Sequence, residues 1–252
     1  MHAQKTDEHR LESLEASDLT YHYPDKGRGI EGISLCLKRG SLTVITGRIG
    51  SGKTTCVQVL QGLLPAERGK IRWNGQEVGD PAAFFVPPRS AYTAQVPHLF
   101  SDPLKDNILL GLPEENVDLS MAVRMAVLER DVETLENGLD TLIGTRGVKL
   151  SGGQAQRTAA ARMLVRDAEL LIFDDLSSAL DVETEQVLWD QLFSTGERTC
   201  LVVSHRRQVL HRANHIIVLK NGRLEAEGDL EMLLATSNEM QRLWRGDFAM
   251  EE

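Results

Sequence analysis

The chain lacks any long hydrophobic run. Its 252 residues contain no apolar segment close to the roughly 18 to 20 residues that a membrane-spanning helix needs. The first ten residues, MHAQKTDEHR, are too charged for the apolar core of a signal peptide. We therefore expect the chain to stay in the cytoplasm.

Cysteine and excess positive charge are also scarce. Cys36, Cys56 and Cys200 are far apart and lack metal-ligand spacing, so we expect reduced thiols in the core. With 28 basic and 37 acidic residues, the net charge of -9 disfavours a broad nucleic-acid-binding surface. The remaining composition, 41% hydrophobic and 26% charged, is typical of a globular protein with a sizeable core.

The first ninety or so residues are rich in strand patterns. Residues 41–46 form a β-branched run, and the pair Asn74-Gly75 favours a tight hairpin turn. Between these two features, a helix is predicted over residues 53–64, with Gly62 as an end signal.

From about residue 103 to residue 166 the pattern becomes helical. Helices are predicted over residues 121–135 and 151–166. Strands and helices then alternate: a buried strand at 170–173, a helix at 182–193, a buried strand at 199–204, a hairpin turned by Asn221-Gly222, and a helix near 230–244. This order predicts a mainly parallel sheet that is interrupted by a helical subdomain.

The segment GRIGSGKT fits the phosphate-loop spacing G-x-x-x-x-G-K-[ST]. It follows a predicted strand and opens a predicted helix, where backbone N–H groups and the helix N-terminus favour a phosphate. Lys53 is predicted to reach the β- and γ-phosphates of a nucleotide, Thr54 to bind Mg²⁺, and Thr55 to contact the α-phosphate side. The predicted contacts are Gly47, Arg48, Ile49, Gly50, Ser51, Gly52, Lys53, Thr54 and Thr55.

A second acidic motif supplies a carboxylate for the metal. Residues 169–175 read ELLIFDD, an apolar strand that ends in two aspartates. By itself, Asp174 would be an ordinary acidic residue at a strand end. The phosphate loop upstream favours a role for Asp174 in holding Mg²⁺.

A further motif, LSGGQ, occupies residues 150–154, about a hundred residues after the phosphate loop. Together the two motifs resemble the ATP-binding cassette of ABC ATPases. The resemblance implies an α/β fold, a P-loop NTPase (RecA-like) core with an antiparallel β subdomain and an inserted helical subdomain. The expected divisions are a linker or disordered segment at 1–13 and one cassette at 14–252, with its core at 14–95 and 167–252 and its helical subdomain at 96–166.

The resemblance also assigns roles to residues that are ambiguous alone. Tyr23 matches the aromatic residue that stacks on adenine, whereas Tyr21 is expected to pack in the strand. Gln95, otherwise a surface loop residue, matches the glutamine that contacts Mg²⁺ and the attacking water. His205 matches the histidine that contacts the γ-phosphate, although a histidine at a strand end is more often simply hydrogen-bonded. Asp181 matches a loop across the dimer interface and also fits an ordinary N-cap.

In this family each LSGGQ faces the ATP held by the other protomer. Ser151, Gly152 and Gly153 open a predicted helix and form an anion site, which Gln154 completes. The resemblance thus implies ATP and Mg²⁺ as ligands, and a second cassette and a transmembrane permease as partners. Such a chain would work at the cytoplasmic face of a membrane, with no nucleic acid partner.

One position departs from the family pattern. Most members carry glutamate directly after the metal-holding aspartate, which is Asp174 here, and that glutamate polarises the attacking water. This chain has Asp175 at the same position. Aspartate retracts the carboxylate by up to roughly 1.5 Å, and a misplacement of about 1 Å can cost on the order of 10²-fold in rate. We predict ATP binding with slow hydrolysis. Both a heterodimer with a glutamate-bearing partner and a homodimer that tolerates aspartate through a shifted backbone fit this pattern.

Two further stretches resemble exporter cassettes. Residues 99–111 read LFSDPLKDNILLG, with Asp102-Pro103 replacing the usual Gly-Thr, and DTLIGTRGVK precedes the LSGGQ. We therefore expect the motor domain of an exporter, on its own or as a separate subunit. An importer or lipoprotein-type cassette remains an alternative. A DNA-repair ABC ATPase would need a long coiled-coil insertion, but the sequence shows no sustained heptads. A ribosome-associated one would need two cassettes, and this length holds only one.

Overall fold

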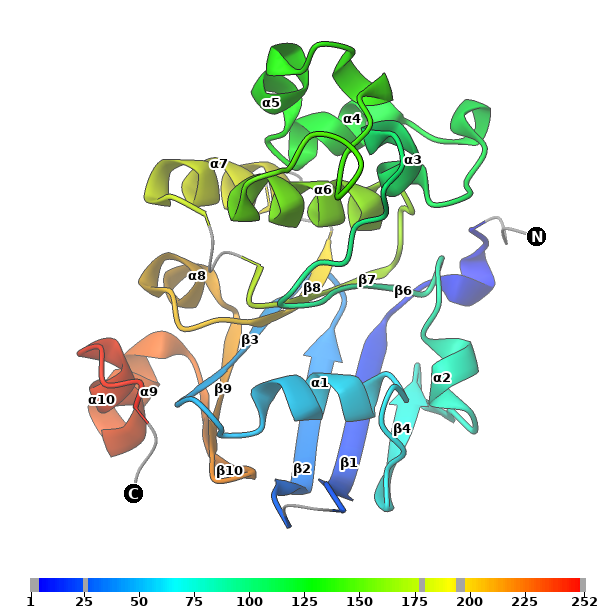
Figure 1. Cartoon of the computed structure of the whole chain (residues 1–252). Helices are drawn as coiled ribbons and strands as arrows, with labels where there is room; N and C mark the ends of the chain where they lie inside the picture. Colours follow the sequence, from blue (N-terminus) through cyan, green and yellow to red (C-terminus); the bar gives the residue numbers. More distant parts are fainter. Residues whose placement is uncertain (1–4, 25–26, 177–179, 194–197, 250–252) are drawn as a thin grey trace.

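Two β-sheets form the frame of the molecule (Figure 1). One is antiparallel, with the order β2-β1-β4-β5, and the other has the order β10-β9-β3-β8-β7-β6. The computed structural model describes residues 5–24, 27–176, 180–193 and 198–249. The strands are β1 (Ser13–His22), β2 (Gly29–Lys38), β3 (Leu42–Gly47), β4 (Arg68–Trp73), β5 (Gln76–Glu77), β6 (Ser90–Thr93), β7 (Leu170–Asp174), β8 (Thr199–Val203), β9 (His215–Lys220) and β10 (Arg223–Gly228).

Helices cover the larger sheet and extend beyond it at one end. Figure 1 shows α3, α4 and α5 gathered beyond α6, at the end of the molecule opposite the antiparallel sheet. The α-helices are α1 (Lys53–Leu60), α2 (Pro81–Phe84), α3 (Leu104–Leu109), α4 (Leu119–Met125), α5 (Glu129–Thr134), α6 (Gly152–Leu164), α7 (Val182–Phe193), α8 (Arg207–Arg212), α9 (Leu230–Thr236) and α10 (Asn238–Trp244). Short 3-10 turns lie at Asp7–His9, Glu114–Asn116 and Gly138–Asp140.

The larger sheet is buried on both faces. Strands β9, β3, β8, β7 and β6 run parallel, and β10 pairs with β9 in the antiparallel sense. Along β7, Leu170 and Ile172 pack with α1 and the antiparallel sheet, whereas Leu171 and Phe173 pack with α6 and α7. This period of two, with apolar residues on both faces, is typical of a parallel strand between two layers.

The structure confirms the predicted α/β architecture. The larger sheet is mainly parallel, the antiparallel sheet is built from strands on either side of β3 in the chain, and a helical segment is inserted before β7. Both predicted hairpins form: Asn74 and Gly75 have φ of 53° and 79°, and Asn221 and Gly222 have φ of 50° and 78°. Two consecutive residues with positive φ are the requirement of the turn that joins tightly paired strands.

Three predicted helices differ in extent. The helix expected to reach residue 64 ends at Leu60, and Gly62 follows at φ 72°, where a Cβ would lie 2.4 Å from the Ala82 backbone nitrogen. The helix expected over residues 121–135 divides into α4 and α5 at Val127, which has φ 56°.

A left-handed residue ends α4 at Val127. The Leu128 N–H donates to the Val123 carbonyl at 3.0 Å and the Val127 N–H donates to the Arg124 carbonyl at 2.9 Å. These two hydrogen bonds are typical of a helix that is closed by a residue with positive φ. The helix predicted near 230–244 likewise divides at Ser237, whose hydroxyl accepts from the Met240 N–H at 3.1 Å and caps α10.

Two other expectations differ from the structure. In the segment expected to be a linker, Leu11 is 0% exposed and Lys5 pairs with Glu169 at 2.9 Å, because the segment packs beside the start of β7. Cys56 and Cys200 are buried thiols as predicted, but Cys36 is exposed, because it alternates with the buried Leu35 and Leu37 along β2.

Among the described residues, no helix combines the length and apolar character that crossing a membrane requires.

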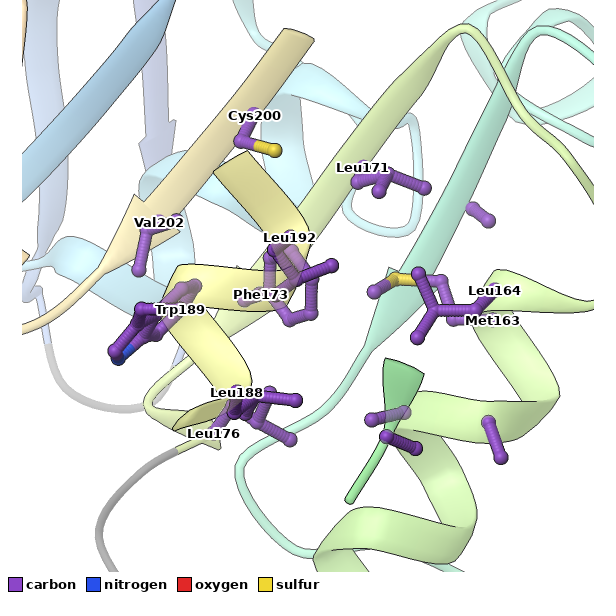
Figure 2. Close-up of a cluster of buried hydrophobic side chains, with 14 of the residues drawn as sticks. Met163, Leu164, Leu171, Phe173, Leu176, Leu188, Trp189, Leu192, Cys200 and Val202 are labelled. Atoms are coloured by element: carbon purple, nitrogen blue, oxygen red, sulfur yellow. The ribbon is translucent and has the colours of Figure 1, made fainter. Parts of the chain in front are cut away.

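Trp189 centres the core beneath α7 (Figure 2). Its indole is 0% exposed and lies edge-on to Phe173, with ring centroids 5.6 Å apart. It also stacks on Phe193 at 5.8 Å. This aromatic group joins α7 to the strand that ends in the two aspartates.

Trp189→Ala should lower the free energy of unfolding by about 3–5 kcal/mol, because it removes a fully buried aromatic side chain and leaves a cavity. Urea denaturation measures this difference. Val187→Ala on the same helix, at 36% exposure, is the matched control and should change stability by no more than about 0.5 kcal/mol. Equal effects of the two substitutions would contradict the assignment of Trp189 as a core anchor.

Candidate nucleotide-binding site

The phosphate loop joins β3 to α1 at the carboxyl end of the parallel sheet. Gly47 has φ 148°, and a Cβ there would lie 2.3 Å from the Leu219 carbonyl oxygen, so the loop can pack against β9 only with glycine. The Lys53 ammonium donates to the Gly47 and Arg48 carbonyl oxygens at 2.8 and 2.7 Å. Burial lowers the pKa of Lys53, and the charges of Asp175 and Asp174 oppose that shift.

Asp174 lies at the end of β7 with 1% exposure. One carboxylate oxygen accepts from the Thr54 hydroxyl at 3.0 Å, and the other accepts from the Tyr92 hydroxyl at 3.2 Å. Burial raises the pKa of Asp174, although both hydrogen bonds oppose the shift. A buried carboxylate beside a threonine hydroxyl is an arrangement of hard oxygen donors that suits Mg²⁺.

Asp175 takes a backbone conformation that is uncommon for residues other than glycine. Its φ is 53°, and its N–H donates to the Val203 carbonyl at 3.0 Å, which fixes it between β7 and β8. The Gln95 side-chain amide donates to the Asp175 Oδ2 at 3.1 Å. Burial raises the pKa of Asp175, and His205 and Gln95 oppose that shift. The loop after β6 is thereby tied to the end of β7.

A cavity of about 620 Å³ unites most of the predicted site. Phosphate-loop residues line it together with side chains from four other segments. The predicted residues along its wall are Tyr23, Ile49, Gly50, Gly52, Lys53, Thr54, Thr55, Gln95, Asp174, Asp175 and His205.

Tyr23 and His205 are two of these cavity-lining side chains. The Tyr23 hydroxyl lies 3.3 Å from the Thr55 hydroxyl, and its ring meets Tyr21 edge-on at 5.1 Å. Tyr21 packs against the core beneath the antiparallel sheet, as expected. Burial lowers the pKa of His205, and the nearby Asp175 charge opposes the shift. His205 is therefore a neutral hydrogen-bonding group near pH 7.

The LSGGQ residues do not line this cavity. Ser151 caps α6: its hydroxyl accepts from the Gln154 N–H at 3.2 Å, and the Gln154 side chain accepts from the Ser151 N–H at 2.8 Å. The Gln154 amide also donates to Asp131 at 3.0 Å, and Arg157 pairs with the same carboxylate at 2.7 Å. Ser151 and Gly152 are exposed, with Gly153 next to them. The helix N-terminus is thus rigid and open to solvent.

Four other predicted residues also lie outside the cavity wall. The Asp181 carboxylate accepts from the Thr184 N–H at 2.9 Å, so it caps α7 as the sequence suggested, and it is exposed. Arg48 lies in the phosphate loop, but its guanidinium pairs with the buried Glu239 at 2.6 Å. Gly47 and Ser51 complete the loop without lining the cavity.

Sequence patterns missed three residues of the site. Tyr92 holds Asp174, Asp131 holds the start of α6, and Phe248 packs on His205 with ring centroids 4.5 Å apart. Tyr92 follows from the pairing of β6 with β7, where it stands opposite Ile172, two residues before Asp174. Neither Asp131 nor Phe248 lies in a motif, so only the folded chain reveals their contacts.

Comparison with known proteins identifies the family. Residues 30–178, more than half of the chain, match the model of the family described as ABC transporter. The chain belongs to the ABC transporter family. The resemblance predicted from GRIGSGKT and LSGGQ is therefore confirmed.

ABC exporters are among the most similar proteins. The ATP-dependent lipid A-core flippase of Yersinia pestis bv. Antiqua is 33% identical over 255 residues, which covers 97% of this chain and 44% of the flippase. ABC transporter B family member 1 of Dictyostelium discoideum is 32% identical, with 89% of this chain and 25% of that protein covered. This ABC chain spans less than half the length of these relatives.

A solved structure supports the same assignment. It is described as a bacterial Atm1-family ABC exporter with ATP bound, and it matches this chain with a TM-score of 0.85 and 29% identity. The match covers 95% of this chain and 43% of that one. The predicted ABC ATPase fold, similar to that of exporter cassettes, is confirmed.

Asp175→Asn should raise the melting temperature of the ligand-free cassette at pH 7. Because burial raises the pKa of Asp175 above its usual value, this group stabilises the fold fully below the unfolded-state pKa and loses that contribution as pH rises through the folded-state pKa. At pH 7 its ionised form therefore opposes folding, and asparagine removes the charge while it can still accept from Gln95.

Thermal melts at several pH values measure the effect. Glu133→Gln, at an exposed position of α5, is the control and should leave the melting temperature unchanged. An Asp175→Asn melting temperature at or below that of the unmodified chain at pH 7 would contradict the assigned direction of the pKa shift.

Proposed function

We propose that this chain is the ATP-hydrolysing motor domain of an ABC exporter and works as a dimer that encloses ATP. The observation that carries the proposal is the convergence of Lys53, Asp174, Asp175, Gln95 and His205 on one cavity. Membership of the ABC transporter family and the similarity to an ATP-bound exporter support it.

The phosphate loop holds the triphosphate. Its glycines allow consecutive N–H groups to face one anion, and the N-terminus of α1 adds favourable potential. Lys53 donates to two loop carbonyls in the free chain, and in the proposed complex it contacts the β- and γ-phosphates. Tyr23, which lines the same cavity, offers an aromatic face to adenine, and such stacking contributes about 1–3 kcal/mol.

The residues around Asp174 fit Mg²⁺. Thr54 and Asp174 already lie in contact, and Gln95 brings an amide oxygen to the same cavity. The raised pKa of Asp174 means that its buried charge lacks full compensation, which a divalent cation supplies. Bound Mg²⁺ neutralises negative charge on the β- and γ-phosphate oxygens.

The remaining side chains act on the attacking water. Asp175 accepts a hydrogen bond from that water and polarises it towards the γ-phosphate, and Gln95 holds the Asp175 carboxylate by donating to its Oδ2. Neutral His205 donates a hydrogen bond to a γ-phosphate oxygen. Because aspartate is shorter than glutamate, its carboxylate lies farther from the phosphate, and hydrolysis at this site is slow.

The exposed start of α6 suits the ATP of a second cassette. Ser151 and the N–H groups of Gly152 and Gly153 lie outside the chain's own cavity and form an anion site at the capped start of α6. A heterodimer would pair this LSGGQ with a partner's phosphate loop and glutamate. A homodimer would join two Asp175 sites.

A permease is the second proposed partner, which would place the chain at the cytoplasmic face of a membrane. The segment that begins at Gln95 exposes two large apolar side chains, Val96 at 67% and Phe100 at 53%. These apolar side chains follow Gln95, which is proposed to contact the nucleotide. A permease docked on them would therefore respond to whether the site holds a nucleotide.

Lys53→Ala should weaken ATP binding by at least about 100-fold, because a charge-assisted contact to two phosphates is worth about 3 kcal/mol in a partly buried site. Fluorescence titration with a labelled ATP analogue measures the affinity. Lys38→Ala, at an exposed strand position, is the control and should bind normally. Unchanged binding by Lys53→Ala would overturn the proposed function.

Asp175→Glu should raise the rate of hydrolysis by about 10²-fold, because the added methylene returns the carboxylate to the water. Single-turnover phosphate release measures the chemical step. The φ of 53° at this position is less favourable for glutamate than for aspartate, so a small loss of thermal stability should accompany the gain. An unchanged rate in a dimer of the variant would show that aspartate length does not limit catalysis.

A further inference from the structure

A buried carboxylate links the phosphate loop to the last helix. Glu239 lies on α10, and its side chain is 2% exposed. The Arg48 guanidinium donates to one of its oxygens at 2.6 Å, and the Lys220 ammonium lies 3.5 Å from the other. Two cations, Arg48 of the phosphate loop and Lys220 at the end of β9, therefore converge on the Glu239 side chain, and such charges hold their geometry because leaving any one of them unpaired is unfavourable.

The chain after α10 adds further contacts to the same loop. We call residues 239–249 the C-terminal strap. Asp247 pairs with the Arg48 guanidinium at 3.4 Å, and the Ala249 carbonyl accepts from it at 3.5 Å. The Phe248 carbonyl accepts from the Ile49 N–H at 3.1 Å. The strap thus contacts the phosphate loop at the Ile49 backbone and at the Arg48 side chain.

The strap also reaches the other side of the site. The Phe248 ring packs on the His205 imidazole, with centroids 4.5 Å apart and planes at 52°. Phe248 is partly buried, and its contact with the imidazole restricts the rotation of the His205 side chain. Of the described residues that line the nucleotide cavity, none belongs to the strap. The strap therefore supports the site from outside and leaves the cavity open.

We propose that the strap positions the nucleotide site: Glu239 orders the phosphate loop through Arg48, and Phe248 orders His205. This inference rests on the proposed function, because it assumes that the cavity holds ATP. A loop rich in glycine loses more conformational freedom on binding than other loops, and a support that orders it beforehand increases affinity. The Glu239 carboxylate and the Phe248 ring then act on different parts of ATP, since Glu239 holds Arg48 of the phosphate loop and the ring holds His205, which is proposed to contact the γ-phosphate.

The dissociation constants of ATP and ADP separate the two actions. Glu239→Gln should weaken ATP and ADP alike, by about tenfold, because both nucleotides use the phosphate loop. Phe248→Ala should weaken ATP about threefold and leave ADP unchanged, because only ATP has a γ-phosphate for His205. Phe248→Tyr keeps the ring and should restore the preference for ATP. Titration with Mg²⁺-ATP and Mg²⁺-ADP measures both dissociation constants for each variant and for the unmodified chain.

Controls come from exposed positions on α9. Glu231→Gln removes a carboxylate and Met232→Ala an apolar side chain, and neither should change either affinity. Because Glu239→Gln leaves Arg48 and Lys220 near an uncharged amide, it can unfold the chain, in which case the partly exposed Phe248 series decides the matter.

The outcomes distinguish the strap from the proposed function. If the unmodified chain binds no ATP, the proposed function is wrong and the strap proposal falls with it. If the unmodified chain binds ATP and Phe248→Ala retains its full ATP preference, the strap proposal alone is overturned. A purely structural strap would lower the melting temperature and change ATP and ADP affinity by the same factor in both variants.

Discussion

The burial of β7 on both faces is the constraint on which the site depends. Its first four residues, 170–173, lie between two hydrophobic layers, so the strand has no polar position before Asp174. Asp174 and Asp175 stand at that end. The parallel pairing of β3, β8 and β7 brings the ends of all three strands to one edge, and there the phosphate loop, His205 and the two carboxylates meet.

Electrostatics at this edge favours a loaded site over an empty one. Burial opposes the charges of Asp174, Asp175 and Lys53, as the directions of their pKa shifts show. Each charge is partly balanced by a neighbour, and none is balanced fully. In the proposed function, a triphosphate with its cation would supply the missing opposite charges, and the same burial that opposes the ionised groups in the free chain would strengthen their interactions with ATP. Stability and binding therefore place opposite demands on Asp175.

Much of this arrangement was accessible from local patterns. The Asn-Gly turns, the Ser151 and Asp181 caps and the phosphate loop follow rules that involve residues only a few positions apart, and the structure contains each of them. The divided helices are not predicted because the break at Val127 depends on a positive φ that β-branched residues rarely adopt, and the hydrophobic pattern gives no signal of it. Cys36 was placed in the core although the alternation of Leu35 and Leu37 indicates the opposite face.

The sequence by itself determined the family and the fold and predicted which residues line the cavity, because these depend on short motifs whose residue types and spacing have a direct physical meaning. Only the tertiary structure decided how the site is held. Tyr92 on Asp174, Asp131 on Gln154, and the strap on Arg48 and His205 join segments far apart in the chain, and no local rule pairs them. Such contacts depend on which side chains the packed layers bring within reach, a property of the whole fold.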